Sequence, residues 1–292
     1  MTSAAKAIGT VRVGVSGWRY PRWRGDFYPR GLAQRRELEY IGTHFSTVEL
    51  NGSFYSLQRP ESYRRWRASV PDDFVFAVKG SRYVTHMLRL RGVEQALANF
   101  FASGVLALGS QLGPLLWQLP EREKFDADVL DAFLSTLPST AGEALELARR
   151  HDARLDGRSW LEIEGDAPLR HALEPRSSTF ADPASLRLLQ QHRAGLVVAD
   201  TAGTWPRFDA LTADFVYIRL HGATTLYHSG YTSAELGDWA SLITAWADGS
   251  GAGDGKPRDV YAYFDNDARG YAPHDALALS ALVESFSPGR TG

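Results

Sequence analysis

Short runs of β-branched and aromatic residues alternate with helical patterns from one end of the chain to the other. This alternation is typical of a parallel sheet wrapped by helices. Eight runs occur, the number of strands that closes a (β/α)8 or TIM barrel. The sequence therefore predicts an α/β fold of this type. The runs are VRVGVSGW from Val11, FSTVELNGSFY from Phe45, FVFAVKG from Phe74, GPLLWQLP from Gly113, RHALEPR from Arg170, GLVVADT from Gly195, FVYIRLHG from Phe215 and DVYAYFDN from Asp259.

One barrel accounts for the whole length of the chain. The 292 residues are close to the roughly 250 that a single barrel uses. The strand and helix patterns continue without a linker to a C-terminal helix near residues 276–286, so we expect a single domain over residues 1–292, with a short disordered or extended N-terminus at residues 1–9. Because the chain shows neither the apolar segment of a secretory signal nor an apolar run that could span a membrane, we expect a cytoplasmic protein without membrane partners.

Composition restricts the chemistry of the chain. It contains no cysteine, which excludes disulfides, thiolate metal ligands and a cysteine nucleophile. The net charge of −2 is unevenly distributed, since residues 1–91 contain 16 Lys and Arg against 7 Asp and Glu. This segment therefore carries about +9 and the remainder about −11. Such asymmetry occurs on surfaces that attract phosphates and on simple solvated faces, and both interpretations remain open.

Helical spacing and capping residues place several elements between the strands. Apolar residues at helical spacing predict a helix within residues 93–108. Asp182 and the proline after it are typical of a helix start. Thr232 with Glu235 has capping-box spacing. The glycine-rich residues 249–255 precede the eighth strand, at the bottom of the barrel, so we interpret them as a linker and not as a phosphate-binding loop.

Polar side chains of the strands are predicted to point into the barrel. In the seventh strand, the aliphatic residues at positions 216, 218 and 220 are expected to face the covering helices, which turns Arg219 and His221 inward. Active sites of such barrels lie at the carboxyl ends of the strands, so we expect the polar groups to gather at that mouth. The same alternation turns inward Tyr217, Glu49, Asn51, Lys79, Gln118, Glu174 and Arg176.

Two interpretations of the inward groups remain open. They can neutralise one another as a buried ion-pair network, or they can line a functional site. Their number favours a site, since burying charges often costs more than their attraction returns. Histidine and carboxylates transfer protons near neutral pH, and cationic side chains bind anions. The candidate catalytic residues are Glu174, His221 and Glu49, and the candidate substrate-binding residues are Lys79, Arg176, Arg219, Asn51, Gln118, Trp18, Tyr20, Tyr227 and Asn266.

A divalent metal ion is a further alternative at the mouth. Glu174, Asp200, His221 and Asp265 come from four consecutive strand ends and carry oxygen and imidazole ligands. Asp200 and Glu174 also suit a role as ion-pair partners or loop caps, and no H-E-x-x-H motif is present. We therefore predict no cofactor, and these four residues form the set that a metal would use.

The loop after the first strand mixes aromatic and basic residues. Aromatic faces stack on bases and arginines neutralise phosphates, so the mixture suits single-stranded nucleic acid. It also suits sugars, and a third interpretation is that the aromatic rings only pack over the barrel rim. A net charge near zero argues against an extended nucleic-acid track. The residues concerned are Trp18, Tyr20, Trp23, Phe27 and Tyr28, with Arg19, Arg22, Arg24 and Arg30.

A series of specific motifs covers nearly the whole chain. They are GWRYPRWRGDFYP from Gly17, VELNGSFY from Val48, FAVKG followed by Thr85 and His86, GPLLWQLP, YIRLHG, YHSGY from Tyr227, and YFDND followed by Gly270, Ala272 and Pro273. In these motifs and their order the chain resembles the YecE-like family, known as domain of unknown function 72 (DUF72). The resemblance implies a barrel and no established reaction. The family usually has His after the motif residues Glu174 and Arg176, whereas this chain has Ser177, so no role of a fifth-strand histidine carries over.

These patterns together predict a small-molecule enzyme with acid and base groups at the mouth. Its expected substrate carries phosphate or carboxylate and includes sugar-like compounds. Hydrolase, lyase and isomerase chemistry all remain open. The alternative is a nucleic-acid-binding protein or a metal-dependent phosphodiester enzyme that uses the same mouth.

Overall fold

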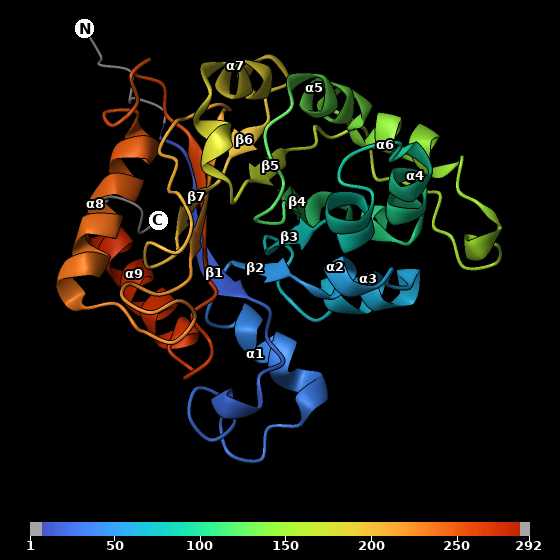
Figure 1. The fold of residues 1–292 in the computed structure, drawn as a ribbon. Helices are drawn as coiled ribbons and strands as arrows, with labels where there is room; N and C mark the ends of the chain where they lie inside the picture. The colour runs from blue at the N-terminus through green and yellow to red at the C-terminus, as the bar shows by residue number, and fades with distance from the viewer. Residues whose placement is uncertain (1–7, 287–292) are drawn as a thin grey trace, which may run out of the picture.

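The computed structural model describes residues 8–286, whose strands form one parallel sheet rolled into a nearly closed barrel (Figure 1). All eight predicted runs contain strand, and one run is divided, which gives nine segments within residues 8–286. The predicted α/β barrel is confirmed. The segments are β1 (Val11–Ser16), β2 (Thr47–Leu50), β3 (Val75–Lys79), β4 (Leu112–Gln118), β5 (His171–Glu174), β6 (Gly195–Leu196), β7 (Val198–Asp200), β8 (Phe215–Leu220) and β9 (Asp259–Phe264).

The barrel closes through the divided strand. The sheet order is β6-β5-β4-β3-β2-β1-β9-β8-β7, so its two edges are consecutive in the chain. β6 pairs with β5 and β7 pairs with β8. Val197, between the two segments, donates its backbone N–H to the carbonyl of Leu173 at 2.9 Å. A single sixth run therefore changes partners at Val197 and joins the two edges of the sheet.

Helices surround the barrel on its outer side, as in Figure 1. Each helix lies between consecutive strands or follows the last one, which is the crossover arrangement that parallel pairing requires. The helices are α1 (Glu37–Gly42), α2 (Gly52–Tyr55), α3 (Pro60–Arg67), α4 (Glu94–Ala102), α5 (Ala127–Thr136), α6 (Ala141–Ala148), α7 (Pro183–Gln191), α8 (Ser233–Asp248) and α9 (Ala272–Phe286).

The helix predicted within residues 93–108 is interrupted. α4 ends at Ala102, and a separate 3-10 helix follows at Val105–Gln111. Gly104, between them, has φ +116°, a conformation that L side chains rarely adopt. A Cβ at this position would also lie 2.6 Å from the Cα of Pro60 at the start of α3. The helical pattern was correct, and the break follows from the close approach of α3.

The predicted helix starts and the bottom loop are confirmed. Asp182 accepts a hydrogen bond from the backbone N–H of Ala184 at the start of α7, at 2.8 Å. Thr232 and Glu235 form a complete capping box at the start of α8. The glycine-rich loop begins at Gly249, whose φ of +80° ends α8, and it leads to the first residue of β9.

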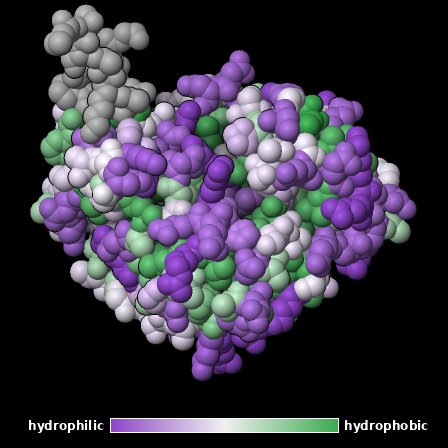
Figure 2. Space-filling view, turned by 90° about the horizontal axis from the view of Figure 1, so that it is seen from above, coloured by the Kyte–Doolittle hydropathy of each residue, from purple (hydrophilic) through white to green (hydrophobic). Residues whose placement is uncertain are grey.

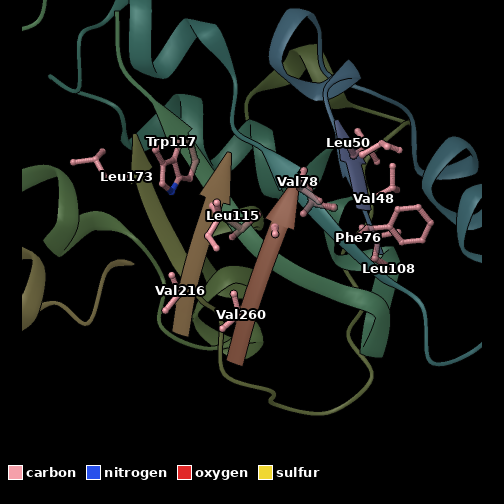
Figure 3. Packing of buried hydrophobic residues seen from close by; sticks show 14 of the residues in the cluster. Val48, Leu50, Phe76, Val78, Leu108, Leu115, Trp117, Leu173, Val216 and Val260 are labelled. Carbon is pink, nitrogen blue, oxygen red and sulfur yellow. The ribbon is translucent and has the colours of Figure 1, made fainter. Parts of the chain in front are cut away.

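Apolar side chains form two layers, one inside the barrel and one between the strands and the helices. Val216, Ile218 and Leu220 belong to the outer layer between strands and helices, which confirms the predicted alternation in β8. Figure 3 shows Val216 and Val260 side by side on neighbouring strands. Inside the barrel, small side chains meet a cluster of aromatic rings, and the polar mouth lies above them. The inner cluster consists of Ala77, Leu116, Ala172, Val197, Ala199, Phe215, Tyr217, Tyr261 and Tyr263.

The flank that carries α5 and α7 is mainly hydrophilic with small dispersed apolar areas (Figure 2). In residues 8–286 no helix combines the length and apolarity needed to cross a membrane. The prediction of an extended or disordered N-terminus concerns residues 1–9, and most of it falls on residues 1–7, outside the described part of the chain.

Candidate active site

Arg219, on β8, lies at the centre of the mouth and contacts three carboxylates from other strand ends. Its Nε and Nη2 donate to the two oxygens of Glu49 at 2.9 and 2.8 Å. Nη1 donates to Glu174 at 2.8 Å, and Nη2 also donates to Asp265 at 3.0 Å. Burial disfavours the charged form, but the carboxylates hold the pKa of Arg219 well above its ordinary value. The predicted inward direction of Arg219, Glu49 and Glu174 is confirmed, and the donors of Arg219 are committed to protein groups.

Glu49 is held in place by four donors. One carboxylate oxygen accepts from the Ser16 hydroxyl and from Arg219 Nη2. The other accepts from Arg219 Nε and, at 2.7 Å, from the Tyr217 hydroxyl. A carboxylate offers about four acceptor sites, so the capacity of Glu49 is filled. The side chain is fully buried. Glu49, a candidate catalytic residue by sequence, is placed as an anchor for Arg219.

Glu174 connects Arg219 to Arg176. Its Oε1 accepts from Nε and Nη2 of Arg176, each at 3.2 Å, and the Arg176 guanidinium lies 3.7 Å from the ring centre of Trp205. Burial raises the pKa of Glu174, but the charges of Arg219 and Arg176 outweigh this effect and lower the pKa to about 2. Glu174 is therefore ionised at neutral pH. Within residues 8–286, Nη1 of Arg176 has no hydrogen-bond acceptor.

His221 lies between two acidic side chains. Its Nε2 is 3.8 Å from Glu174, in agreement with the expectation that the inward polar groups gather at the mouth. Its Nδ1 is 3.1 Å from Asp265 Oδ2, without the alignment of a hydrogen bond. Burial raises the pKa of Asp265, but Arg219 and His221 hold it well below its ordinary value. His221 is fully buried, and the ring of Tyr227 packs edge-on against it at 5.3 Å. His221 is therefore sealed from solvent in this conformation.

Lys79, at the end of β3, has a nearly buried amine without a partner. The residue is 9% exposed. Its Nζ lies 4.5 Å from the ring centre of Phe54, and in residues 8–286 no side chain forms a hydrogen bond or salt bridge with it. Burial and the charge of Arg219 lower the pKa of Lys79 to about 8, against the opposing effect of the nearby carboxylates. This amine is the least committed cationic donor of the mouth that the structure describes.

His86 and Asp267 were not proposed as site residues from sequence. His86 lies in the short helical segment Tyr83–Met87 after β3, and its ring centre is 5.2 Å from that of Phe54. Its pKa is lowered by burial, by Lys79 and by Arg176. Asp267 follows β9, accepts a hydrogen bond from Trp23 Nε1, and has a pKa raised by burial to about 7. Both residues lie in motifs that the family resemblance identified. Both lie outside the strands, so the alternation on which the prediction relied did not include them.

Tyr20, Asn51 and Gln118 lie at the mouth as predicted. Tyr20 donates its hydroxyl to the Ser16 carbonyl at 2.6 Å, and burial and then Asp265 raise its pKa. Asn51 donates to the Ser16 hydroxyl at 2.8 Å, and its buried Oδ1 has no partner within residues 8–286. Gln118 donates to the carbonyl of Leu119 at 2.6 Å. These contacts hold the walls of the mouth.

Asn266 and Trp18 both pack against other parts of the protein. Asn266 is fully buried and donates to the Ser229 carbonyl at 3.0 Å and to Asp275 at 2.7 Å, so it fixes two loops to each other. Trp18 belongs to the outer apolar layer and packs edge-on against Trp66 at 5.7 Å. Their predicted contact with substrate is not supported by these positions.

Three of the four candidate metal ligands, Glu174, His221 and Asp265, lie together at the mouth, and the fourth, Asp200, lies apart from them. Asp200 ends β7 on the outward side and accepts from the Tyr231 hydroxyl at 3.2 Å and from the Ala202 N–H at 3.3 Å. At the mouth, the Arg219 guanidinium occupies the position between the carboxylates that a cation would need. In the part of the chain that the structure describes, no group of three or more His, Asp or Glu side chains could hold a metal ion.

The aromatic residues of the first loop pack against one another. Trp23 and Tyr28 are fully buried, and Phe27 is nearly so. Trp23 contacts Phe27 at 5.6 Å and Tyr28 at 5.6 Å between ring centres. The third interpretation of this loop, in which the rings pack over the rim, agrees with these positions. These three rings are not exposed for stacking on bases.

Fold and mouth define this chain as a (β/α)8-barrel protein with a buried network of ionised side chains at the carboxyl ends of its strands. The chain matches the family described as "Protein of unknown function DUF72" over residues 12–289, and it belongs to that family. The resemblance inferred from the motifs is thereby confirmed.

Relatives and solved structures agree with this assignment. The chain is 30% identical to the UPF0759 protein YecE of Escherichia coli (strain K12) over 133 residues, which is 46% of this chain and 45% of YecE. It is 32% identical to the UPF0759 protein YunF of Bacillus subtilis (strain 168) over 78 residues, 26% of each chain. The matches therefore span less than half the length of these relatives.

The solved structures show the same fold. The crystal structure of a DUF72 family protein from Thermotoga maritima has a TM-score of 0.74 at 23% identity and covers 94% of this chain and 99% of its own. A DUF72 family protein from Enterococcus faecalis has a TM-score of 0.69 at 16% identity, with 94% and 96% covered.

Proposed function

We propose that this protein is a small-molecule enzyme that binds a phosphate- or carboxylate-bearing substrate at the mouth and acts on it by proton transfer. The observation that carries the proposal is the uncommitted donors of Lys79 and Arg176. The three central carboxylates are each paired with Arg219. An entering anion therefore meets free cationic donors and no unpaired carboxylate among these three.

The anion would bind between β3 and β5. Lys79 and Arg176 both lower the pKa of His86 and both act on Glu174, so these cationic groups surround one region of the mouth. Charge-assisted hydrogen bonds are the strong ones in such a site, and the planar guanidinium suits carboxylate and phosphate oxygens. Arg219 was the third candidate for this role. Its donors are occupied, and we assign it to positioning the carboxylates.

The proton-transfer groups in this proposal are Asp267 and Glu174. Asp267 has a pKa of about 7 and is only partly buried, so both of its protonation states are populated near neutral pH. Glu174 is ionised and can accept a proton, although Arg219 and Arg176 make it a weak base. His221 supports this side of the mouth through its proximity to Glu174 and Asp265. A sugar-like substrate also fits, since its hydroxyls would meet Tyr20 and Asn51.

Calorimetric titration with inorganic phosphate tests the anion site. Replacing Arg176 with Gln should weaken phosphate binding about tenfold or more, which corresponds to the loss of one charge-assisted contact. Arg187→Gln, at an exposed arginine of α7, is the matched control and should leave the affinity unchanged. Equal affinity of the Arg176 variant and the unchanged chain, with both folded, would contradict the proposal.

A further inference from the structure

We propose that Lys79 is an amine nucleophile that forms an iminium with the carbonyl carbon of an aldehyde or ketone substrate. This inference rests on the proposed function and adds a carbonyl group to the anionic substrate bound there. It concerns one of four lysines in the chain, the others being Lys6, Lys124 and Lys256. Lys124 and Lys256 are exposed, whereas Lys79 is 9% exposed, so the chain contains its own reference amines.

The backbone at Lys79 is fixed, whereas the amine of its side chain has no hydrogen-bond partner among the described residues. The Ser53 hydroxyl donates to the Lys79 carbonyl at 2.6 Å. The next residue, Gly80, leaves space for Trp117, whose ring would lie 2.3 Å from a Cβ at that position. The Phe54 ring lies 4.5 Å from Nζ and covers one side of it. The backbone of Lys79 and one side of its amine are thus held.

The absence of an ion pair distinguishes Lys79 from a structural lysine. Nearly buried ammonium groups normally pair with a carboxylate, because an unpaired charge is costly to bury. In the described residues, no carboxylate oxygen lies within 4.0 Å of Nζ. The oxygens that could have paired with it are held by Arg219 instead. Among the described residues, the amine is therefore left without an ion-pair partner.

The surroundings of Nζ increase the neutral fraction of the Lys79 amine. Burial and then the charge of Arg219 lower the pKa of Lys79 to about 8, while Glu49, Glu174 and Asp265 act in the opposite sense. His86, whose own pKa is lowered by burial and then by Lys79, packs against the same Phe54 ring from the short helical segment Tyr83–Met87 after β3. At pH 7 about a tenth of such amines are neutral, against less than about one in a thousand for an ordinary lysine. Only the neutral form attacks a carbonyl.

The reaction balances without a co-reactant. The neutral amine attacks the carbonyl carbon, a C–N bond forms, and the amine proton moves to the oxygen to give a carbinolamine. One further proton then allows the hydroxyl to leave as water, and the nitrogen is left as a protonated iminium. Starting from the ammonium, the sum is one ammonium and one carbonyl giving one iminium and one water. The iminium withdraws electrons from the adjacent carbon, which makes proton removal there easier.

Reductive trapping tests the inference. The protein is mixed with pyruvate, or separately with dihydroxyacetone phosphate, and reduced with borohydride. A trapped iminium raises the mass of the chain by that of the ketone less one oxygen. Peptide mapping should find the adduct at Lys79 at least about tenfold in excess over Lys124 and Lys256, as expected from the larger neutral fraction. Lys79→Arg should remove this adduct, and Lys124→Arg should retain it.

Two further measurements separate the possible failures. Phosphate titration of Lys79→Arg, which keeps the charge, should show binding, so loss of the adduct cannot be a loss of the anion site. If the unchanged chain binds phosphate but labels its lysines equally, the lysine inference is overturned and the proposed function stands. If it binds no phosphate, the proposed function is overturned. Should Lys79→Arg fail to fold, competitive acetylation of the unchanged chain decides, because an unusually nucleophilic Lys79 must react ahead of Lys124 at pH 7.

Discussion

Replacing Arg219 with Met would leave the buried Glu49 and Glu174 and the partly buried Asp265 without the guanidinium that contacts them all. The magnitude follows from Glu174 alone, whose pKa is lowered from 4.5 to about 2. That shift corresponds to roughly 3 kcal/mol of stability at neutral pH. Removing one partner of a buried ion pair typically costs about 3–5 kcal/mol. We therefore expect the free energy of unfolding, measured in urea at pH 7, to fall by about 3–5 kcal/mol.

The pH dependence gives this prediction its sign. The pKa of Glu174 is lowered on folding, so its stabilising contribution is present above about pH 4.5 and is lost as the pH falls toward 2. In the Met variant the carboxyls lose their cationic partner, so they should take up protons at a higher pH than in the unchanged chain. The difference in stability between the two proteins should therefore narrow steadily as the pH is lowered from about 7 to about 3.

Exposed Arg187 on α7 provides the control. Arg187→Met removes the same group from the surface and should change stability by no more than about 0.5 kcal/mol. A loss below about 1 kcal/mol in Arg219→Met, or a difference that stays constant with pH, would refute the claim that these carboxylates depend on Arg219.

Two further predictions concern the rim and the backbone. Burial raises the pKa of Asp267 to about 7, so this carboxyl destabilises the fold increasingly as the pH rises from about 4 to 7. Asp267→Asn, which keeps an acceptor for Trp23, should therefore raise the urea midpoint of unfolding at pH 8 and not at pH 4. Equal shifts of the midpoint at both pH values would disprove this. Gly104→Ala should destabilise the protein by about 2 kcal/mol or more in thermal melts, because of the positive φ of Gly104 and the close contact of a Cβ with Pro60. Gly253→Ala is the control, since the space around Gly253 is open, and it should leave the stability nearly unchanged. Similar melting temperatures for the two variants would contradict the reasoning.

The sequence predicted the barrel because strand alternation and capping are local. The pattern of residues 216–220 was enough to place Arg219 inside the barrel, and Thr232 with Glu235 was enough to start α8. The division of the sixth run at Val197 was not predictable in the same way. It depends on where two distant edges of the sheet meet, and no residue within the run signals that meeting.

The prediction of the site was limited because the sequence does not show which side chains bond to one another. Alternation correctly brought Arg219, Glu49 and Glu174 together, but it could not show that one guanidinium would use donors on several carboxylates. Asp200 is a different case, because the outward direction of Leu196 and Val198 in the same run already indicates that it points outward. That signal was available in the sequence.

Loops were the other limit, because their side chains have no fixed alternation. Trp18 packs against Trp66, which lies on α3, and such a contact between distant segments has no signature in either segment. Asp267 gains its raised pKa from burial in a loop beside Trp23. The order of motifs identified both regions as specific to the family, but it could not distinguish a packed tryptophan from a group open to a ligand.

The ion network and the free amine at the mouth are two consequences of one arrangement. If Glu49 and Glu174 were not bonded to Arg219, their charges would hold a larger fraction of Lys79 as the ammonium, since nearby negative charges raise the pKa of an amine. Arg219 both occupies these carboxylates and adds a positive charge that lowers the pKa of Lys79. Arg219→Met should therefore raise that pKa and reduce trapping at Lys79 in the folded protein. A purely structural network would lose stability without changing the relative labelling of Lys79 and exposed Lys124.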